Sequence, residues 1–150
     1  LVNHMLYELS WIPDLLEGKT VAEVGNKYDG DLLGKDHHQA WHLAAHKAAT
    51  AVQKVDLDKT VHLSFADVDA KYYVNQVAGD LLLHAWDADQ SLQCSLVFAN
   101  NMAQTLYDII EPQHKGFAAS GLFASPQKVP KTARIQAKLL ALVGRREPAV

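Results

Sequence analysis

The chain has 150 residues, of which 49% are hydrophobic and 21% are charged, a composition typical of one globular domain. The formal net charge of −3 and the lack of a basic stripe argue against a nucleic-acid partner. Cys94 is the single cysteine, and no apolar run reaches the roughly 18 residues that cross a membrane, so we expect a cytoplasmic protein with no disulfide and no membrane partner.

The first predicted helix covers residues 1–17, where apolar residues recur at helical spacing on one side. This apolar side consists of Leu1, Met5, Leu9, Ile12 and Leu16. Gly18 is placed to end the helix, because glycine readily adopts the left-handed conformation found just after helix C-termini. Pro13 interrupts the pattern and is expected to bend the helix or to restart it one turn later.

A loop and a second helix follow. Residues 19–35 contain three glycines and are expected to form a loop with one short helical turn near residues 21–24. Asp36 is a good N-cap for a helix over about residues 37–55. The side of this helix that is expected to face inward carries Trp41, Ala44, Ala45, Ala48, Val52 and Val55.

The middle of the chain contains the only strand pattern. Apolar and polar residues alternate from Val61 to Phe65, which predicts one short strand. Asp67 or Asp69 is then expected to cap a long helix over about residues 70–90.

Two further helices are expected in the last third of the chain. One covers about residues 94–110 and stops at Pro112. Residues 116–131 are rich in glycine and proline and are expected to be irregular, and a last short helix over about 132–143 ends at Gly144. Four or five helices with one small β element indicate a mainly α bundle.

Asp80 and His84 are the most informative pair in the sequence. They lie four residues apart in the long helix, so their Cβ atoms are about 5–6 Å apart on one face. They share an arc of about 80° with Tyr73 and Val77, inside the stripe that the helix is expected to bury. A buried carboxylate needs a partner, and a divalent metal ion is one candidate. The alternatives are a hydrogen-bonded Asp–His pair or a lysine or arginine from another helix.

A metal site usually needs a third protein ligand, and His4 is the best candidate. It shares an edge of the first helix with Trp11 and Leu15, although it could equally be a boundary histidine that packs on Trp11. Asp87 follows His84 by three residues and is a candidate acceptor for the ring N–H that does not bind the metal. The alternative for Asp87 is an ordinary acid on the helix surface.

His38, His42 and His46 also have metal-like spacing, at i, i+4 and i+8. The helical wheel places His42 and His46 opposite the Trp41 side, in solvent, where histidines can take up added metal without a biological role. No residue stands out as catalytic or as cofactor-binding, because the sequence has no glycine-rich phosphate loop and no Gly-x-Ser-x-Gly motif.

Four segments of the chain, residues 1–4, 60–65, 79–87 and 139–145, resemble one family. It is the uncharacterised branch of the DinB-like superfamily that is related to the N-terminal domain of mycothiol-dependent maleylpyruvate isomerase. The most specific of these motifs is the Asp-x-x-x-His-Ala-Trp-Asp stretch that begins at Asp80. The resemblance covers nearly the whole chain.

The resemblance implies a single domain over residues 1–150, a four-helix bundle of the up-down type with a three-ligand metal site. By position the ligands are His4, Asp80 and His84, the residues that helix geometry also favours. Relatives have another helix before the position of Leu1, so we expect the chain to be a fragment or its start to be misplaced. Relatives of known function use bacterial thiols such as mycothiol or bacillithiol.

We therefore expect a metal-dependent enzyme, a thiol S-transferase or isomerase that acts on a small electrophile. Two histidines and one carboxylate leave an open coordination position on a zinc-like ion, where a thiol would lose its proton. Zinc is the expected metal, with nickel, cobalt and ferrous iron as alternatives. Water activated at the same position would make the protein a hydrolase.

Two other hypotheses stay open. One is a non-catalytic protein that binds a metal or a small ligand in the same pocket, in the form of a homodimer if an apolar face of the bundle is left uncovered. The other is that no metal binds and that Asp80 and His84 simply pair in the core.

Overall fold

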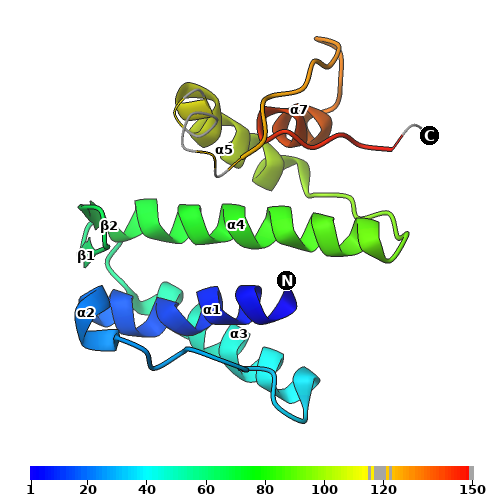
Figure 1. The fold of residues 1–150 in the computed structure, drawn as a ribbon. Coiled ribbons are helices and arrows are strands. Elements are labelled where there is room, and N and C mark those ends of the chain that lie inside the picture. Colours follow the sequence, from blue (N-terminus) through cyan, green and yellow to red (C-terminus); the bar gives the residue numbers. More distant parts are fainter. Residues whose placement is uncertain (115, 117–120, 122, 149–150) are drawn as a thin grey trace. The chain divides into compact units, whose positions relative to one another are not determined.

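The computed structural model describes residues 1–114, 116, 121 and 123–148. Within them the chain is mainly helical and has a small two-stranded sheet (Figure 1). It forms two compact units, Leu1–Leu92 and Gln93–Val150. The mainly α prediction with a small β element is confirmed, whereas the single domain stays a prediction.

The first helix, α1 (Val2–Glu17), is continuous. Gly18 ends it with a φ of 106°, as the sequence predicts. Pro13 lies inside the helix, so the predicted restart after it is wrong. Proline removes one backbone hydrogen bond, but the buried residues Ile12, Leu15 and Leu16 pack around this turn and hold the chain helical.

The loop and the second long helix agree with the prediction. Thr20 caps the short helix α2 (Val21–Val24) in a reciprocal capping box with Glu23. Asp36 caps α3 (His37–Lys54) by accepting a hydrogen bond from the backbone N–H of Gln39. Of the predicted inward side of α3, Ala48 is buried and the other members are partly buried against the core.

Asp14 ties α1 to the segment that follows it. Its carboxylate is buried and accepts hydrogen bonds from the Lys19 and Lys27 ammonium groups and from the Tyr28 hydroxyl, the last two at 2.6 and 2.7 Å. Burial disfavours the ionised form, but these three donors hold the pKa of the Asp14 carboxyl well below its usual range. The sequence analysis did not single out this cluster.

The β element is a hairpin of β1 (Thr60–His62) and β2 (Asp67–Asp69), which pair antiparallel. The predicted single strand from Val61 to Phe65 is therefore wrong, because Leu63 already lies outside β1 and the exposed fraction of Phe65 is 64%. The second strand was missed because its aspartates favour helix caps. Asp69 has both roles, since it ends β2 and accepts a hydrogen bond from the backbone N–H of Tyr72.

The long helix of the first unit is α4 (Ala70–Ser91), as predicted. Figure 1 shows α1 between α3 and α4, with α1 and α4 running in opposite directions. This arrangement brings the N-terminal turns of α1 beside the C-terminal half of α4. The buried residues of α4 are Ala70, Tyr73, Val77, Gly79, Leu83 and Trp86.

In the second unit, α5 (Asn100–Ile110) packs against α7 (Ile135–Leu142). The predicted helix start at Cys94 is wrong by six residues. Gln136 explains the difference, because its side-chain oxygen accepts from the backbone N–H of Phe98 at 2.8 Å and its nitrogen donates to the carbonyl of Leu96 at 3.0 Å. These bonds keep the segment before α5 extended.

The helix α5 ends at Ile110, as predicted. The chain continues through Pro112 in the 3₁₀ turn η1 (Glu111–Gln113). The last helix begins three residues later than predicted. Residues 124–130 have no regular secondary structure, in agreement with the predicted irregular segment, of which 117–120 and 122 lie outside the described residues.

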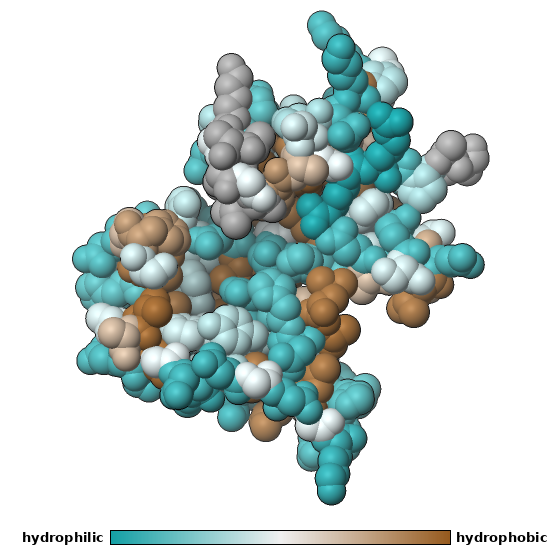
Figure 2. Space-filling view, in the orientation of Figure 1, coloured by the Kyte–Doolittle hydropathy of each residue, from teal (hydrophilic) through white to brown (hydrophobic). Residues whose placement is uncertain are grey.

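The face shown in Figure 2 is mainly hydrophilic, with hydrophobic surface at the N-terminal end of α1. Leu1 and Val2, at that end, are both exposed. No helix among the described residues combines the length and the apolar character needed to cross a bilayer. The homodimer stays a prediction.

Candidate functional site

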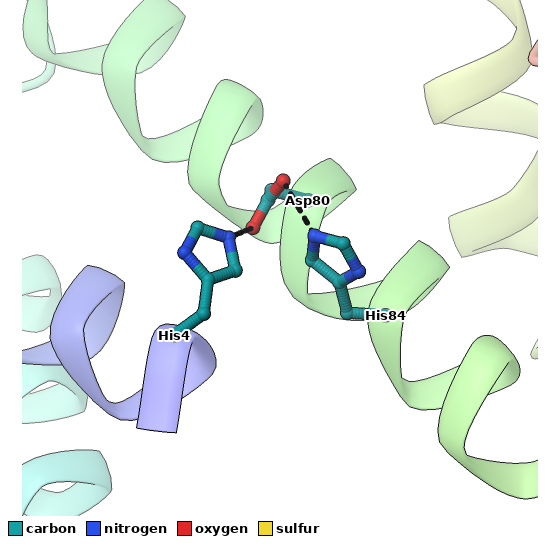
Figure 3. A group of neighbouring side chains, drawn as sticks. All are labelled: His4, Asp80 and His84. Atoms are coloured by element: carbon teal, nitrogen blue, oxygen red, sulfur yellow. Dashed lines mark hydrogen bonds and ion pairs between the residues drawn. The ribbon is translucent and has the colours of Figure 1, made fainter. Parts of the chain in front are cut away.

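His4, Asp80 and His84 lie together in the first unit (Figure 3). His4 comes from α1, and Asp80 and His84 come from neighbouring turns of α4. The Nε2 atom of His4 is 3.2 Å from Oδ2 of Asp80, and the Nε2 atom of His84 is 3.4 Å from Oδ1 of the same carboxylate. One ligand atom from each residue fits within 4.8 Å of the others. The structure thus brings all three candidate ligands together.

Local sequence explains why these side chains meet. The spacing of Asp80 and His84 puts them one above the other on α4. His4 stands beside the buried Met5 in the first turns of α1, on the side where α1 and α4 pack. The two imidazole rings lie edge to face, with centroids 4.9 Å apart.

The cluster is less buried than the helical wheel predicts. The exposed fractions of the side chains are 45% for His4, 35% for Asp80 and 24% for His84. Asp80 is therefore a half-buried carboxylate between two imidazoles and is not isolated in the core. Water and small molecules can reach the cluster from solvent, which an open metal site requires.

A second carboxylate stands behind each histidine. The Nδ1 atom of His84 lies 3.4 Å from Oδ2 of Asp87, and the Nδ1 atom of His4 lies 4.0 Å from Oε1 of Glu8. The His84 Nδ1 atom is buried and makes no hydrogen bond within the described part of the chain, so the Asp87 contact is a close approach only. Carboxylates in this position orient metal-bound imidazoles through the outer ring nitrogen.

Asp87 was predicted for this role, whereas Glu8 was missed. The spacing of His4 and Glu8, one helical turn apart, was the available signal. Burial raises the pKa of the Glu8 carboxyl, and the nearby charge of Asp80 raises it further, while His4 opposes the shift. The raised pKa of Glu8 reflects a concentration of negative charge beside Asp80, which a bound cation would offset.

Tyr73 is a buried polar residue of α4 whose phenol is influenced by the charge of Glu8. Its side chain is buried, and its hydroxyl finds no hydrogen-bond partner among the described residues. Burial and the charge of Glu8 both raise the pKa of the Tyr73 phenol, so it stays a neutral donor at neutral pH.

The remaining histidines lie away from this cluster. His38, His42 and His46 are exposed on α3, as predicted. The Nε2 atoms of His38 and His42 are 3.2 Å apart. His62 pairs across the hairpin with Asp67, with 2.8 Å between its Nδ1 atom and Oδ1.

Two hollows in the first unit lie elsewhere. The larger, about 740 Å³, is lined mainly by the C-terminal halves of α1 and α3, and the other, about 420 Å³, lies between α1, α3 and the loop around Tyr28. Neither is lined by His4, Asp80 or His84.

Comparison of the chain with protein-family models, with curated protein sequences and with solved structures found no match. The assignment of a function therefore depends on the geometry of the cluster and on the resemblance of its motifs.

Proposed function

We propose that this protein binds one divalent transition-metal ion through His4, Asp80 and His84, in a helical bundle of the DinB-like type. The single observation that supports the proposal best is the approach of two imidazole nitrogens to one carboxylate at 3.2 and 3.4 Å. A tetrahedral zinc ion with usual bond lengths separates neighbouring nitrogen and oxygen donors by about 3.3–3.5 Å. The two nitrogen–oxygen distances match this spacing, each to a different oxygen of Asp80, and a single ion requires the three ligand atoms, which now lie within 4.8 Å of one another, to draw closer together.

The donor set also selects the class of metal. Two neutral imidazoles and one carboxylate suit zinc, nickel, cobalt or ferrous iron, whereas calcium and magnesium prefer sites made of oxygen alone. Zinc is the first choice. Glu8 and Asp87 add negative charge near the ion, and their carboxylates lie 4.0 and 3.4 Å from the outer nitrogens of His4 and His84.

We further propose that the protein uses this site in a thiol-dependent transfer or isomerisation. A zinc ion with one open position lowers the pKa of a bound thiol, so that the sulfur becomes a nucleophile near neutral pH. The chain's own contribution is to supply the three ligands and to place the Glu8 and Asp87 carboxylates 4.0 and 3.4 Å from the outer nitrogens of the two histidine rings.

A non-catalytic metal-binding protein is the second candidate. The observation in its favour is that neither of the two hollows described above lies at the cluster. Activation of water in place of a thiol, which would give a hydrolase, uses the same ligands.

Metal content tests the ligand assignment. We expect purified wild-type protein to carry about one equivalent of transition metal for its single three-ligand site, and His84→Ala to carry little, as measured by elemental analysis. His114→Ala is the matched control, because within the described part of the chain this ring bonds the backbone of its own turn and lies outside the cluster, and its metal content should equal that of the wild type. Equal metal in the wild type and His84→Ala would contradict the assignment and favour the simple Asp–His pair.

Thiol-dependent turnover separates the enzyme from the binder. With mycothiol or bacillithiol and a panel of small electrophiles, we expect the metal-loaded wild type to be active and Asp80→Asn to lose at least about 100-fold in rate, because the neutral amide is a much weaker ligand than the carboxylate. Loss of thiol consumption is the readout, with metal content measured on the same samples. A wild type that holds metal but consumes no thiol with any acceptor would favour the binder.

A further inference from the structure

A second pair of histidines converges on the exposed side of α3, within the first unit. His38 and His42 lie one helical turn apart near the start of α3, and both are exposed. Their Nε2 atoms are 3.2 Å apart, and their ring centroids are 4.4 Å apart at an interplanar angle of 67°. The two outer nitrogens thus lie close together on an exposed part of α3.

The separation of the two nitrogens suits a shared cation. If each Nε2 atom binds a metal at about 2.0–2.1 Å, a nitrogen–nitrogen distance of 3.2 Å corresponds to an N–metal–N angle of about 100–105°, close to the tetrahedral value. In the absence of a metal the same two atoms can share one hydrogen bond, which in exposed positions is weak because water competes for both groups.

We propose that His38 and His42 form a second, solvent-exposed site for a divalent transition metal, separate from His4, Asp80 and His84. The helix fixes the two rings before the metal arrives, because residues at i and i+4 face each other. Both rings are already in water, so the site forms without burying a charge. The remaining coordination positions face solvent and are filled by water or by an external ligand.

The chemistry of the pair defines the class of ion. Two imidazoles bind copper(II), nickel and zinc, with copper(II) tightest, and give magnesium and calcium no oxygen donors. With two protein ligands in place of three and no carboxylate, the site is weaker than the cluster between α1 and α4. The Asp36 carboxylate at the N-cap of α3 offsets the positive end of the helix dipole near His38.

Zinc titration of the 150-residue chain tests the proposal. His84→Ala serves as the background, because it removes a ligand of the first site. We expect this background to bind zinc through His38 and His42, and its affinity, measured by isothermal titration calorimetry, to fall by about tenfold or more when His42→Ala is added, since even loss of an outer partner commonly costs 10–100-fold.

His46→Ala in the same background is the matched control, because this ring lies one turn further along the exposed side of α3. We expect it to leave the affinity unchanged. Far-UV circular dichroism checks that each variant is folded, and alanine at these exposed positions favours the helix.

The proposal is overturned if zinc binding is the same with and without His42, or if His46→Ala reduces affinity as much as His42→Ala does. If His84→Ala has no effect on metal content, the first site is wrong, but the comparison of His42 with His46 still decides the second.

Discussion

At the scale of single residues, Asp14 shows how a buried charge can be stabilised by its partners. Its side chain is 7% exposed, and its carboxylate is matched by two ammonium groups and one hydroxyl. Removal of one partner of such a buried pair usually costs more than the pair itself contributes, because the other charges are left uncompensated. Lys19 and Lys27 are about half exposed, so water can solvate them after Asp14 is replaced. The loss of stability is therefore smaller than for a fully buried ion pair.

Asp14→Asn is therefore expected to lower the free energy of unfolding at pH 7 by about 2 kcal/mol, below the 3–5 kcal/mol of a fully buried pair. Because the pKa of the Asp14 carboxyl is lower in the folded chain than in the unfolded one, its contribution is present above about pH 4 and is lost as the pH falls further. Urea unfolding at several pH values measures the difference, which should shrink in acid.

Asp29→Asn is the matched control for this prediction, since Asp29 is an exposed aspartate in the loop that carries Lys27 and Tyr28. It should change the free energy of unfolding by no more than about 0.5 kcal/mol at either pH. If the free energy of unfolding that Asp14→Asn loses does not depend on pH, packing and not charge is the cause of the loss.

At the scale of elements, the C-terminal end of α7 depends on the absence of a side chain. Gly144 has a φ of 77°, and a Cβ atom placed on it would lie 2.5 Å from Cβ and 2.8 Å from the carbonyl oxygen of Ala124. The extended segment before α7 thus passes directly against the turn after it. The backbone N–H of Gln127 donates to Ala141 at 2.8 Å in the same region.

Gly144→Ala is expected to destabilise the second unit by about 2 kcal/mol or more, because left-handed strain of about 1–2 kcal/mol is combined with a clash against backbone. Gly34→Ala isolates the strain alone, since Gly34 has a φ of 58° and open space where the Cβ would lie. Thermal unfolding of both variants measures the two effects. Equal losses of stability in Gly144→Ala and Gly34→Ala would contradict the close approach of Gly144 to Ala124.

At the scale of the whole molecule, the sequence predicts the local features well and the long-range ones poorly. Helix caps such as Asp36 and the stop at Gly18 depend on neighbouring residues, and both appear where expected. The start of α5 depends on Gln136, 38 residues away from Phe98, and the strand β2 exists only because β1 needs a partner. The hydrophobic periodicity of the sequence carries no information on such contacts between distant segments.

In the candidate site, too, the local features could be predicted from the sequence and the long-range ones could not. Asp80 and His84 follow from spacing within one helix, whereas the choice of His4 required the helical wheel and a family resemblance. Glu8 was missed because its role appears only once α1 lies against α4. The degree of burial was overestimated, since the wheel gives the direction of a side chain but not how much of it the neighbouring helix covers.

The two halves of the His4–Asp80 contact are 76 positions apart along the chain. An unfolded chain rarely brings such distant residues together, so the three-residue cluster exists only in the native conformation. Any ion that occupies it is consequently a ligand of the folded state alone and shifts the folding equilibrium by mass action. At a free metal concentration one hundred times the dissociation constant, this linkage would add about 2.7 kcal/mol to the free energy of unfolding of the first unit. Metal supply would then govern the stability of the fold as well as its function.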